Sequence, residues 1–327
     1  MSNVEAEPDE VACGASTFTG VLHPRDVPLG GPRAMRVRRT LPQRERSLIG
    51  AWCFVDHYGP HDVGSGAGMD VPPHPHTGLQ TVSWLFRGEV EHQDSAGVRA
   101  LVRPGELNLM TAGAGICHSE VSTPATTVLH GVQLWVALPD EHRDTARDFT
   151  HYAPPVHEHD GARIRVFLGD LAGAHSPVPS FTPLLGAQVD LRPGITVRLP
   201  VARDFEHGVL VDTGALTAGG TPLEGGDLWY QSPGNDELVL DNSDGGPARV
   251  LVLGGPPFPE PLVMWWNFVG RSHADIVEYR RRWEAHDERF GSVDSYPGAR
   301  LSAPALPNVE LRPRRNPPSQ SPDQGAR

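Results

Sequence analysis

The segments His-Pro-His (74–76) and His-Ser-Glu (118–120) are the most informative parts of this chain. Each places two ligand-type side chains two residues apart. Side chains two apart in a β-strand point to the same face, so each pair can aim into one space. Together the segments offer three imidazoles and one carboxylate, a set that suits a first-row transition metal such as iron, manganese, cobalt, nickel or copper. The two segments therefore predict a metal centre built on β-strands.

The rest of the sequence also favours short strands joined by turns. Among 327 residues there are 36 glycines and 33 prolines, and hydrophobic residues make up 38%. Strand-like segments form two blocks, at 81–86, 107–110 and 128–136 and again at 163–168, 237–240 and 249–253, and apolar and polar residues alternate in several of them. This pattern is typical of an antiparallel barrel or sandwich.

The length allows two domains. We expect a flexible N-terminus at 1–16 and a metal-binding domain at 17–145. A charged linker at 146–160 would lead to a second domain without a metal site at 161–295, followed by a disordered tail at 296–327. One helix is predicted near the end of the second domain. Ser272 and Asp275 form a capping box at its start, and Gly291 is suited to its end.

Composition excludes several classes of function. The net charge of −12 argues against a nucleic-acid-binding surface. All 28 basic residues are arginine, so a phosphate-binding P-loop lysine and a lysine Schiff base are both excluded. No apolar run approaches the roughly 20 residues that span a bilayer, and the acidic start is unlike a signal peptide. We therefore expect a cytoplasmic protein that has no contact with membranes.

Longer motifs resemble the pirins, a branch of the cupin superfamily. They cover residues 55–60, 74–82, 110–120 and 131–139 in this order, with a weaker match around 254–268. The resemblance implies an all-β fold of two antiparallel, jelly-roll-type cupin barrels that face each other, with a short C-terminal helix. It also implies that only the N-terminal barrel binds metal.

The same resemblance implies the metal and its ligands. Pirins bind iron, as Fe²⁺ or Fe³⁺, and the matching positions are His74, His76, His118 and Glu120. Gln80 stands where many cupins have a glutamate, which could change the charge around the ligands.

Three further polar residues leave two alternatives open. His57, His92 and Asp94 lie in family-like positions near the first hairpins. They either orient the ligands or line the mouth of the cavity, or they are ordinary polar surface residues.

Two functions of different classes fit this resemblance. Some pirins are similar to quercetin 2,3-dioxygenases, in which a flavonol or another enolic substrate chelates the metal and dioxygen cleaves its ring. Glu120 would then be the catalytic base. Other pirins are similar to redox-responsive regulators that bind a transcription factor or a metabolic enzyme. The sequence favours the enzyme, with a protein partner as the alternative.

Overall fold

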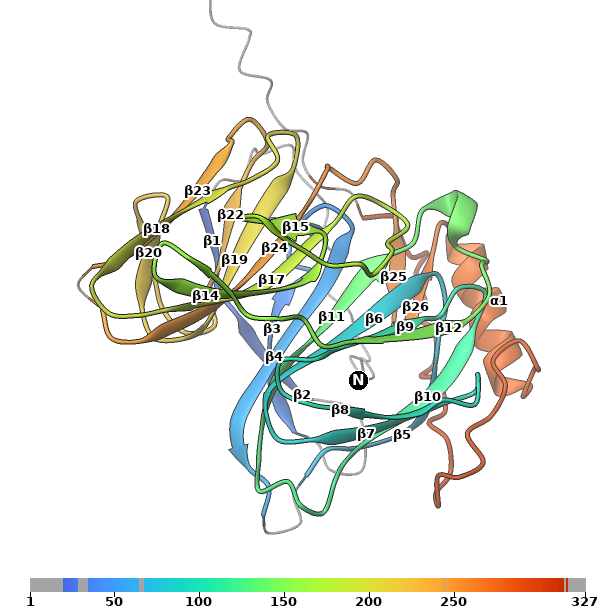
Figure 1. The fold of residues 1–327 in the computed structure, drawn as a ribbon. Helices are drawn as coiled ribbons and strands as arrows, with labels where there is room; N and C mark the ends of the chain where they lie inside the picture. Colours follow the sequence, from blue (N-terminus) through green and yellow to red (C-terminus); the bar gives the residue numbers. More distant parts are fainter. Residues whose placement is uncertain (1–19, 29–34, 65–67, 244, 315, 317–327) are drawn as a thin grey trace, which may run out of the picture.

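The computed structural model describes residues 20–28, 35–64, 68–243, 245–314 and 316. Figure 1 shows two β-structured lobes in contact, with one helix at the edge of the lower lobe. The expected flexible segment 1–16 lies outside the described residues. No helix in the described part is long and apolar enough to cross a membrane.

The N-terminal unit consists of two antiparallel sheets. Its seven-stranded sheet has the order β12 (Asp148–Tyr152), β9 (Leu107–Thr111), β6 (Leu79–Arg87), β11 (Val128–Ala137), β4 (Trp52–Asp62), β3 (Arg36–Leu41) and β2 (Arg25–Pro28). Its four-stranded sheet has the order β5 (Asp70–His76), β10 (Ile116–Ser122), β7 (Val90–Asp94) and β8 (Arg99–Val102).

The C-terminal unit repeats this arrangement. Its seven-stranded sheet has the order β1 (Gly20–Leu22), β22 (Leu228–Gln231), β19 (Glu206–Thr213), β24 (Ala248–Gly255), β17 (Leu185–Leu191), β14 (Ala162–Leu168) and β13 (His157–His159). Its four-stranded sheet has the order β18 (Ile195–Pro200), β23 (Glu237–Asn242), β20 (Leu216–Ala218) and β21 (Thr221–Leu223). A small hairpin, β15 (Asp170–Leu171) and β16 (Ala174–His175), completes the unit. The predicted pair of barrels is thus confirmed.

The two seven-stranded sheets pack against each other through one shared apolar core. This core takes Val82 and Trp84 from β6, Val132 and Leu134 from β11, and Leu210, Leu251 and Leu253 from the C-terminal sheet. The Trp84 indole also donates to Gln188 Oε1 at 2.9 Å across the contact. Because each strand alternates its side chains, the opposite face of β6 and β11 is turned toward the interior of the N-terminal barrel.

The strands do not follow the predicted domain boundaries. β1 lies within residues 17–145 but pairs with β22 of the C-terminal sheet. The expected linker, 146–160, contains two strands. β12 is an edge strand of the N-terminal large sheet, and β13 is an edge strand of the C-terminal one. Conversely, the hairpin of β25 (Val263–Trp265) and β26 (Phe268–Gly270) contacts the N-terminal unit, where Val269 N donates to Thr77 O at 3.1 Å.

Helix α1 (His273–Glu284) begins as predicted and ends earlier. Ser272 and Asp275 form the capping box. The predicted end at Gly291 is wrong, because His286 adopts a left-handed φ of 56° directly after the helix. The His286 and Asp287 amides then donate to Trp283 O and Arg282 O, both at 3.0 Å, in a Schellman motif.

The C-terminal segment also differs from the prediction. Residues 296–314 are not a free tail. Leu301, Leu306 and Leu311 pack on the apolar cluster beneath α1, and Leu301 N donates to Pro73 O at 2.8 Å. The start of α1 lies across a charged groove from the short 3-10 helix η1 (Asp140–His142). Composition predicted disorder because proline and polar residues outnumber these leucines.

A buried ionic cluster joins the two units. Asp212 of β19 accepts hydrogen bonds at Oδ1 from Nε2 of His57 and of His130, at 2.7 and 2.6 Å. Its Oδ2 accepts from Arg249 Nε at 2.6 Å. The histidines come from β4 and β11, so this carboxylate connects strands of both units. Burial raises the pKa of Asp212, but the bonds from the two histidines outweigh burial and hold this pKa well below its ordinary value.

We expect Asp212→Asn to lower the free energy of unfolding by about 3–5 kcal/mol at pH 7, because it leaves buried basic groups uncompensated. A depressed acid pKa adds stability above the unfolded value of about 3.9, and this stability is lost as the pH falls below that value. The difference from the wild type should therefore shrink below about pH 4. Urea unfolding between pH 7 and pH 3.5 measures it, and a difference that stays constant with pH would contradict this account.

Candidate metal centre

The pairing of β5 with β10 brings the two ligand segments together. In this antiparallel register His118 lies opposite His74, and Ile116 lies opposite His76. A register shift between His118 and Glu120 then places Glu120 opposite Val71 on this side. The strands alternate their side chains, so the ligand-type residues share the inner face of the four-stranded sheet.

The three histidines form a compact buried group. Their ring centroids are 5.1 Å apart for His74 and His76, 4.3 Å for His74 and His118, and 5.0 Å for His76 and His118. One ring nitrogen from each lies within 4.8 Å of the others. Nε2 of all three is buried with no hydrogen-bond partner among the described residues. Buried polar atoms normally have partners, so three such nitrogens on rings grouped this closely indicate a site for a cation.

The protonation state of these rings suits metal binding. Burial lowers the pKa of His74 to about 3, and burial with the neighbouring histidines lowers the pKa of His76 and of His118 well below the usual value. All three are therefore neutral at pH 7. His74 Nδ1 lies 2.8 Å from Pro72 O and donates to it, which leaves Nε2 as a bare lone pair.

Glu120 lies beside this group and contacts the opposite sheet. It forms a second set of ligand-type atoms with His118 and His92, within 4.8 Å of one another. Its Oε1 accepts from Ser83 Oγ of β6 at 3.2 Å, and Ser83 Oγ is also 3.0 Å from Gln133 Oε1 of β11. One hydroxyl proton cannot serve both oxygens. With the Gln133 amide in the opposite orientation, Nε2 donates to Ser83, which then donates to Glu120.

The structure gives His57 a different place from His92 and Asp94, although the sequence treated the three residues together. His92 and Asp94 lie behind His118, where His92 Nδ1 is 3.4 Å from His118 Nδ1. His57 instead belongs to the ionic cluster between the units. That cluster, His57, His130 and Asp212, is a third set of ligand-type atoms. Arg249 on Asp212 and Arg38, 3.3 Å from His57 Nε2, already supply its positive charge, which disfavours a metal there.

An aromatic wall borders the histidines. The Trp135 ring of β11 meets His76 at nearly a right angle, at a centroid distance of 5.2 Å, and stacks on Phe54 at 4.0 Å.

Gln80 points to the same face of β6 as Val82 and Trp84, because side chains two residues apart in a strand share a face. Val82 and Trp84 lie in the core between the units. The Gln80 amide donates to Thr111 Oγ1 at 2.9 Å. The glutamine at this position therefore faces away from the histidines.

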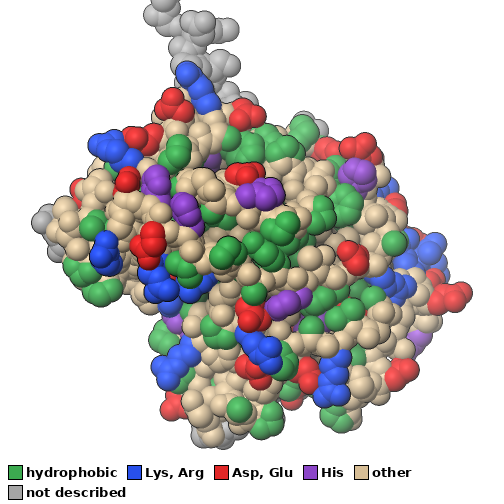
Figure 2. Space-filling model, in the orientation of Figure 1, with side chains coloured by type: hydrophobic (Ala, Val, Ile, Leu, Met, Phe, Trp, Pro, Cys, Tyr) green, Lys and Arg blue, Asp and Glu red, His purple; other side chains and the backbone are tan. Residues whose placement is uncertain are grey.

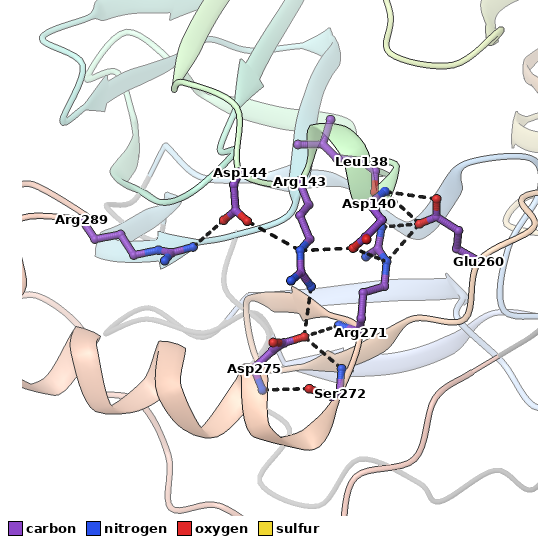
Figure 3. Close-up of polar contacts among 9 residues, drawn as sticks. All are labelled: Leu138, Asp140, Arg143, Asp144, Glu260, Arg271, Ser272, Asp275 and Arg289. Carbon is purple, nitrogen blue, oxygen red and sulfur yellow. Dashed lines mark hydrogen bonds and ion pairs between the residues drawn. The ribbon is translucent and has the colours of Figure 1, made fainter.

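A separate surface groove of about 570 Å³ is lined by charged residues near the start of α1 (Figure 3). Arg143 NH1 is 3.1 Å from Asp275 Oδ2, and Arg271 NH2 is 2.6 Å from Glu260 Oε2. Arg271 also donates to Leu138 O at 2.6 Å. These opposite charges pair with one another, so the network fastens the segment around α1 to the N-terminal unit. None of the ligand-type histidines lines this groove.

The fold and the site define a two-barrel cupin protein with a histidine-rich centre in one barrel. The Pirin family profile matches residues 34–136, and the profile of the pirin C-terminal cupin domain matches residues 186–291. The chain belongs to the pirin family, as the sequence motifs predicted.

Three relatives illustrate the match. A Pseudomonas aeruginosa protein provisionally named quercetin 2,3-dioxygenase is 44% identical over 86% of this chain and 89% of its own length. A pirin-like protein of Caulobacter vibrioides is 35% identical over 79% of this chain and 91% of its own. The crystal structure of quercetin 2,3-dioxygenase from Acinetobacter baumannii has a TM-score of 0.85 and 40% identity, covering 90% of this chain and 97% of that one.

Sequence reasoning missed the residues that come from the opposite sheet. The sequence pattern marks Ser83, Gln133 and Trp135 only as strand residues, because it does not say which strand faces the histidines. A polar serine and glutamine in otherwise apolar strands were the one sign that these strands line a site. The two side chains contact Glu120 only because β6 and β11 pair side by side.

Proposed function

We propose that this chain is a metal-dependent dioxygenase that opens the ring of a flavonol or a related enolic compound. The observation that carries the proposal is the group of three buried, neutral histidines whose Nε2 atoms lack partners among the described residues, with Glu120 beside them. The names of the relatives from Pseudomonas aeruginosa and Acinetobacter baumannii support the same reaction class.

In this proposal His74, His76, His118 and Glu120 hold the metal, which we take to be iron. Neutral imidazoles and one carboxylate are a donor set suited to it. When bound, iron would supply a Lewis acid that acidifies a chelating hydroxyl and a centre at which dioxygen reacts. The other described groups of ligand-type atoms are the His92 set, which shares these residues, and the arginine-flanked cluster at Asp212.

The protein groups around the centre have separate tasks. Glu120 takes the proton of the substrate hydroxyl as the base. Ser83 Oγ, which donates to Glu120 Oε1, keeps that carboxylate turned toward the site. Trp135 places its aromatic ring next to His76 and keeps water away from the ring under attack. In the overall reaction a flavonol and dioxygen give an ester product and carbon monoxide.

We expect His76→Ala and His118→Ala to lose most of the bound iron, because each removes an imidazole that no other described side chain replaces. Metal analysis of protein purified without oxygen gives the result. His207→Gln is the matched control, since His207 is an equally buried histidine in the C-terminal unit. Normal iron content in either alanine variant would refute the ligand assignment.

We expect Glu120→Gln to keep part of the iron and to lose flavonol turnover, because an amide cannot accept the hydroxyl proton. Steady-state oxygen uptake, corrected for iron content, measures the loss. Turnover per iron that equals the wild-type value would reject Glu120 as the base.

The first experiment on the proposal itself is oxygen uptake by the iron-loaded wild-type protein after addition of quercetin. We expect uptake that depends on iron and is matched by carbon monoxide release. Iron near one per chain without any uptake would overturn the enzyme assignment for flavonols. That outcome would favour the alternative of a redox-responsive protein that binds a protein partner.

A further inference from the structure

A second histidine, His92 of β7, lies next to His118 and within reach of Glu120. Strand β7 pairs with β10 so that Asp94 lies opposite His118 and His92 lies opposite Glu120. His118 Nδ1 is 3.4 Å from His92 Nδ1, and His92 Nε2 is 3.0 Å from Asp94 Oδ2. The side chains of His92 and Asp94 are 3% and 0% exposed. The three residues therefore form a buried chain of hydrogen bonds that ends at a carboxylate.

This chain determines which nitrogens carry hydrogen. An ionised carboxylate can only accept, so His92 Nε2 is the donor to Asp94. In a neutral His92 ring the remaining nitrogen, Nδ1, is then an acceptor. His118 Nδ1 must donate to it, which leaves His118 Nε2 as the bare nitrogen. Nε2 is also the atom that has no partner among the described residues, and the His118 ring lies 4.3 Å from the ring of His74 and 5.0 Å from that of His76, between ring centroids.

The far end of the chain is held rigidly. Asp94 Oδ1 accepts from the backbone amides of Ala96 and Val98, at 2.8 and 3.2 Å. The His92 ring packs on Phe149 of β12 at a centroid distance of 4.9 Å. Neither Asp94 nor His92 is therefore free to turn away from His118.

We propose that His92 and Asp94 are positioning residues that fix the tautomer and orientation of His118 and thereby set the metal affinity of the site. The proposal rests on the proposed function only in that it takes His118 Nε2 as a ligand. His74 is oriented differently, by the neutral carbonyl of Pro72. His118 is thus linked through a second imidazole to a negative charge, and such a link strengthens the imidazole as a donor.

The tautomer can be tested on the metal-free protein. Long-range proton–nitrogen NMR spectra distinguish a protonated from a bare ring nitrogen, and His118→Gln identifies the His118 signals. We expect His118 to be protonated at Nδ1 and bare at Nε2 in the wild type, and to become a mixture of tautomers in His92→Phe. A wild-type ring protonated at Nε2, or a His118 tautomer unchanged in His92→Phe, would overturn the proposal.

Metal affinity gives a second readout that does not depend on turnover. We expect His92→Phe to bind Co²⁺ about 10–100-fold more weakly than the wild type, with the same visible absorption bands, since the ligands themselves remain. His92→Gln should recover much of the loss, because an amide can accept from His118 and donate to Asp94. Unchanged affinity in His92→Phe would overturn the proposal, as would altered absorption bands, because these would make His92 a ligand.

The matched control is His57→Phe. His57 is as buried as His92 and is likewise bonded to a buried carboxylate, Asp212, but in the cluster between the units. We expect its Co²⁺ affinity to stay within about twofold of the wild type, although its stability falls. An equal loss of affinity in both variants would assign the effect to general destabilisation. Failure of flavonol turnover leaves these comparisons intact, whereas a wild type that binds no Co²⁺ would refute the site itself.

Discussion

The pairing of β5 with β10 is the constraint on which the site depends. Because His118 lies opposite His74 in this register, three imidazoles meet on one face of one sheet. Burial of these rings keeps them neutral and leaves Nε2 atoms unsatisfied among the described residues, which is costly without a ligand. A slip of one residue between the strands would turn half of the set to the other face.

The remaining parts of the structure supply what that sheet lacks. The facing strands β6 and β11 bring Ser83, Gln133 and Trp135 to the open side of the histidines. Strand β7 brings His92 and Asp94 next to His118. The centre thus has three kinds of contact around it: the hydrogen bond to the Glu120 carboxylate, the Trp135 ring, and the chain from His118 through His92 to the buried Asp94 carboxylate.

On the face drawn in Figure 2, acidic and basic side chains are interspersed over both lobes.

Local patterns predicted the fold class, the main strands, the start of α1 and the four ligand-type residues. Spacing of two along a strand is sufficient to group side chains, and the pirin motifs supplied the order of the barrels. The sequence did not predict that the units exchange their ends, because pairing of β1 with β22 depends on contacts some 200 residues apart. It also misplaced the end of α1, since a left-handed His286 replaced the expected glycine. His92 was left undecided because only the register of β7 places it behind His118.

The exchange of ends means that neither unit is complete on its own stretch of chain. Strand β1, at the start of the described residues, closes an edge of the C-terminal sheet, while α1 and the segment after it cover the N-terminal barrel. A single cut in the connection near residue 155 would therefore release no self-sufficient half. The two fragments would stay associated, because β1 of the first fragment pairs with the C-terminal sheet and α1 of the second packs on the N-terminal barrel. Two barrels joined in this way cannot be separated or exchanged one barrel at a time.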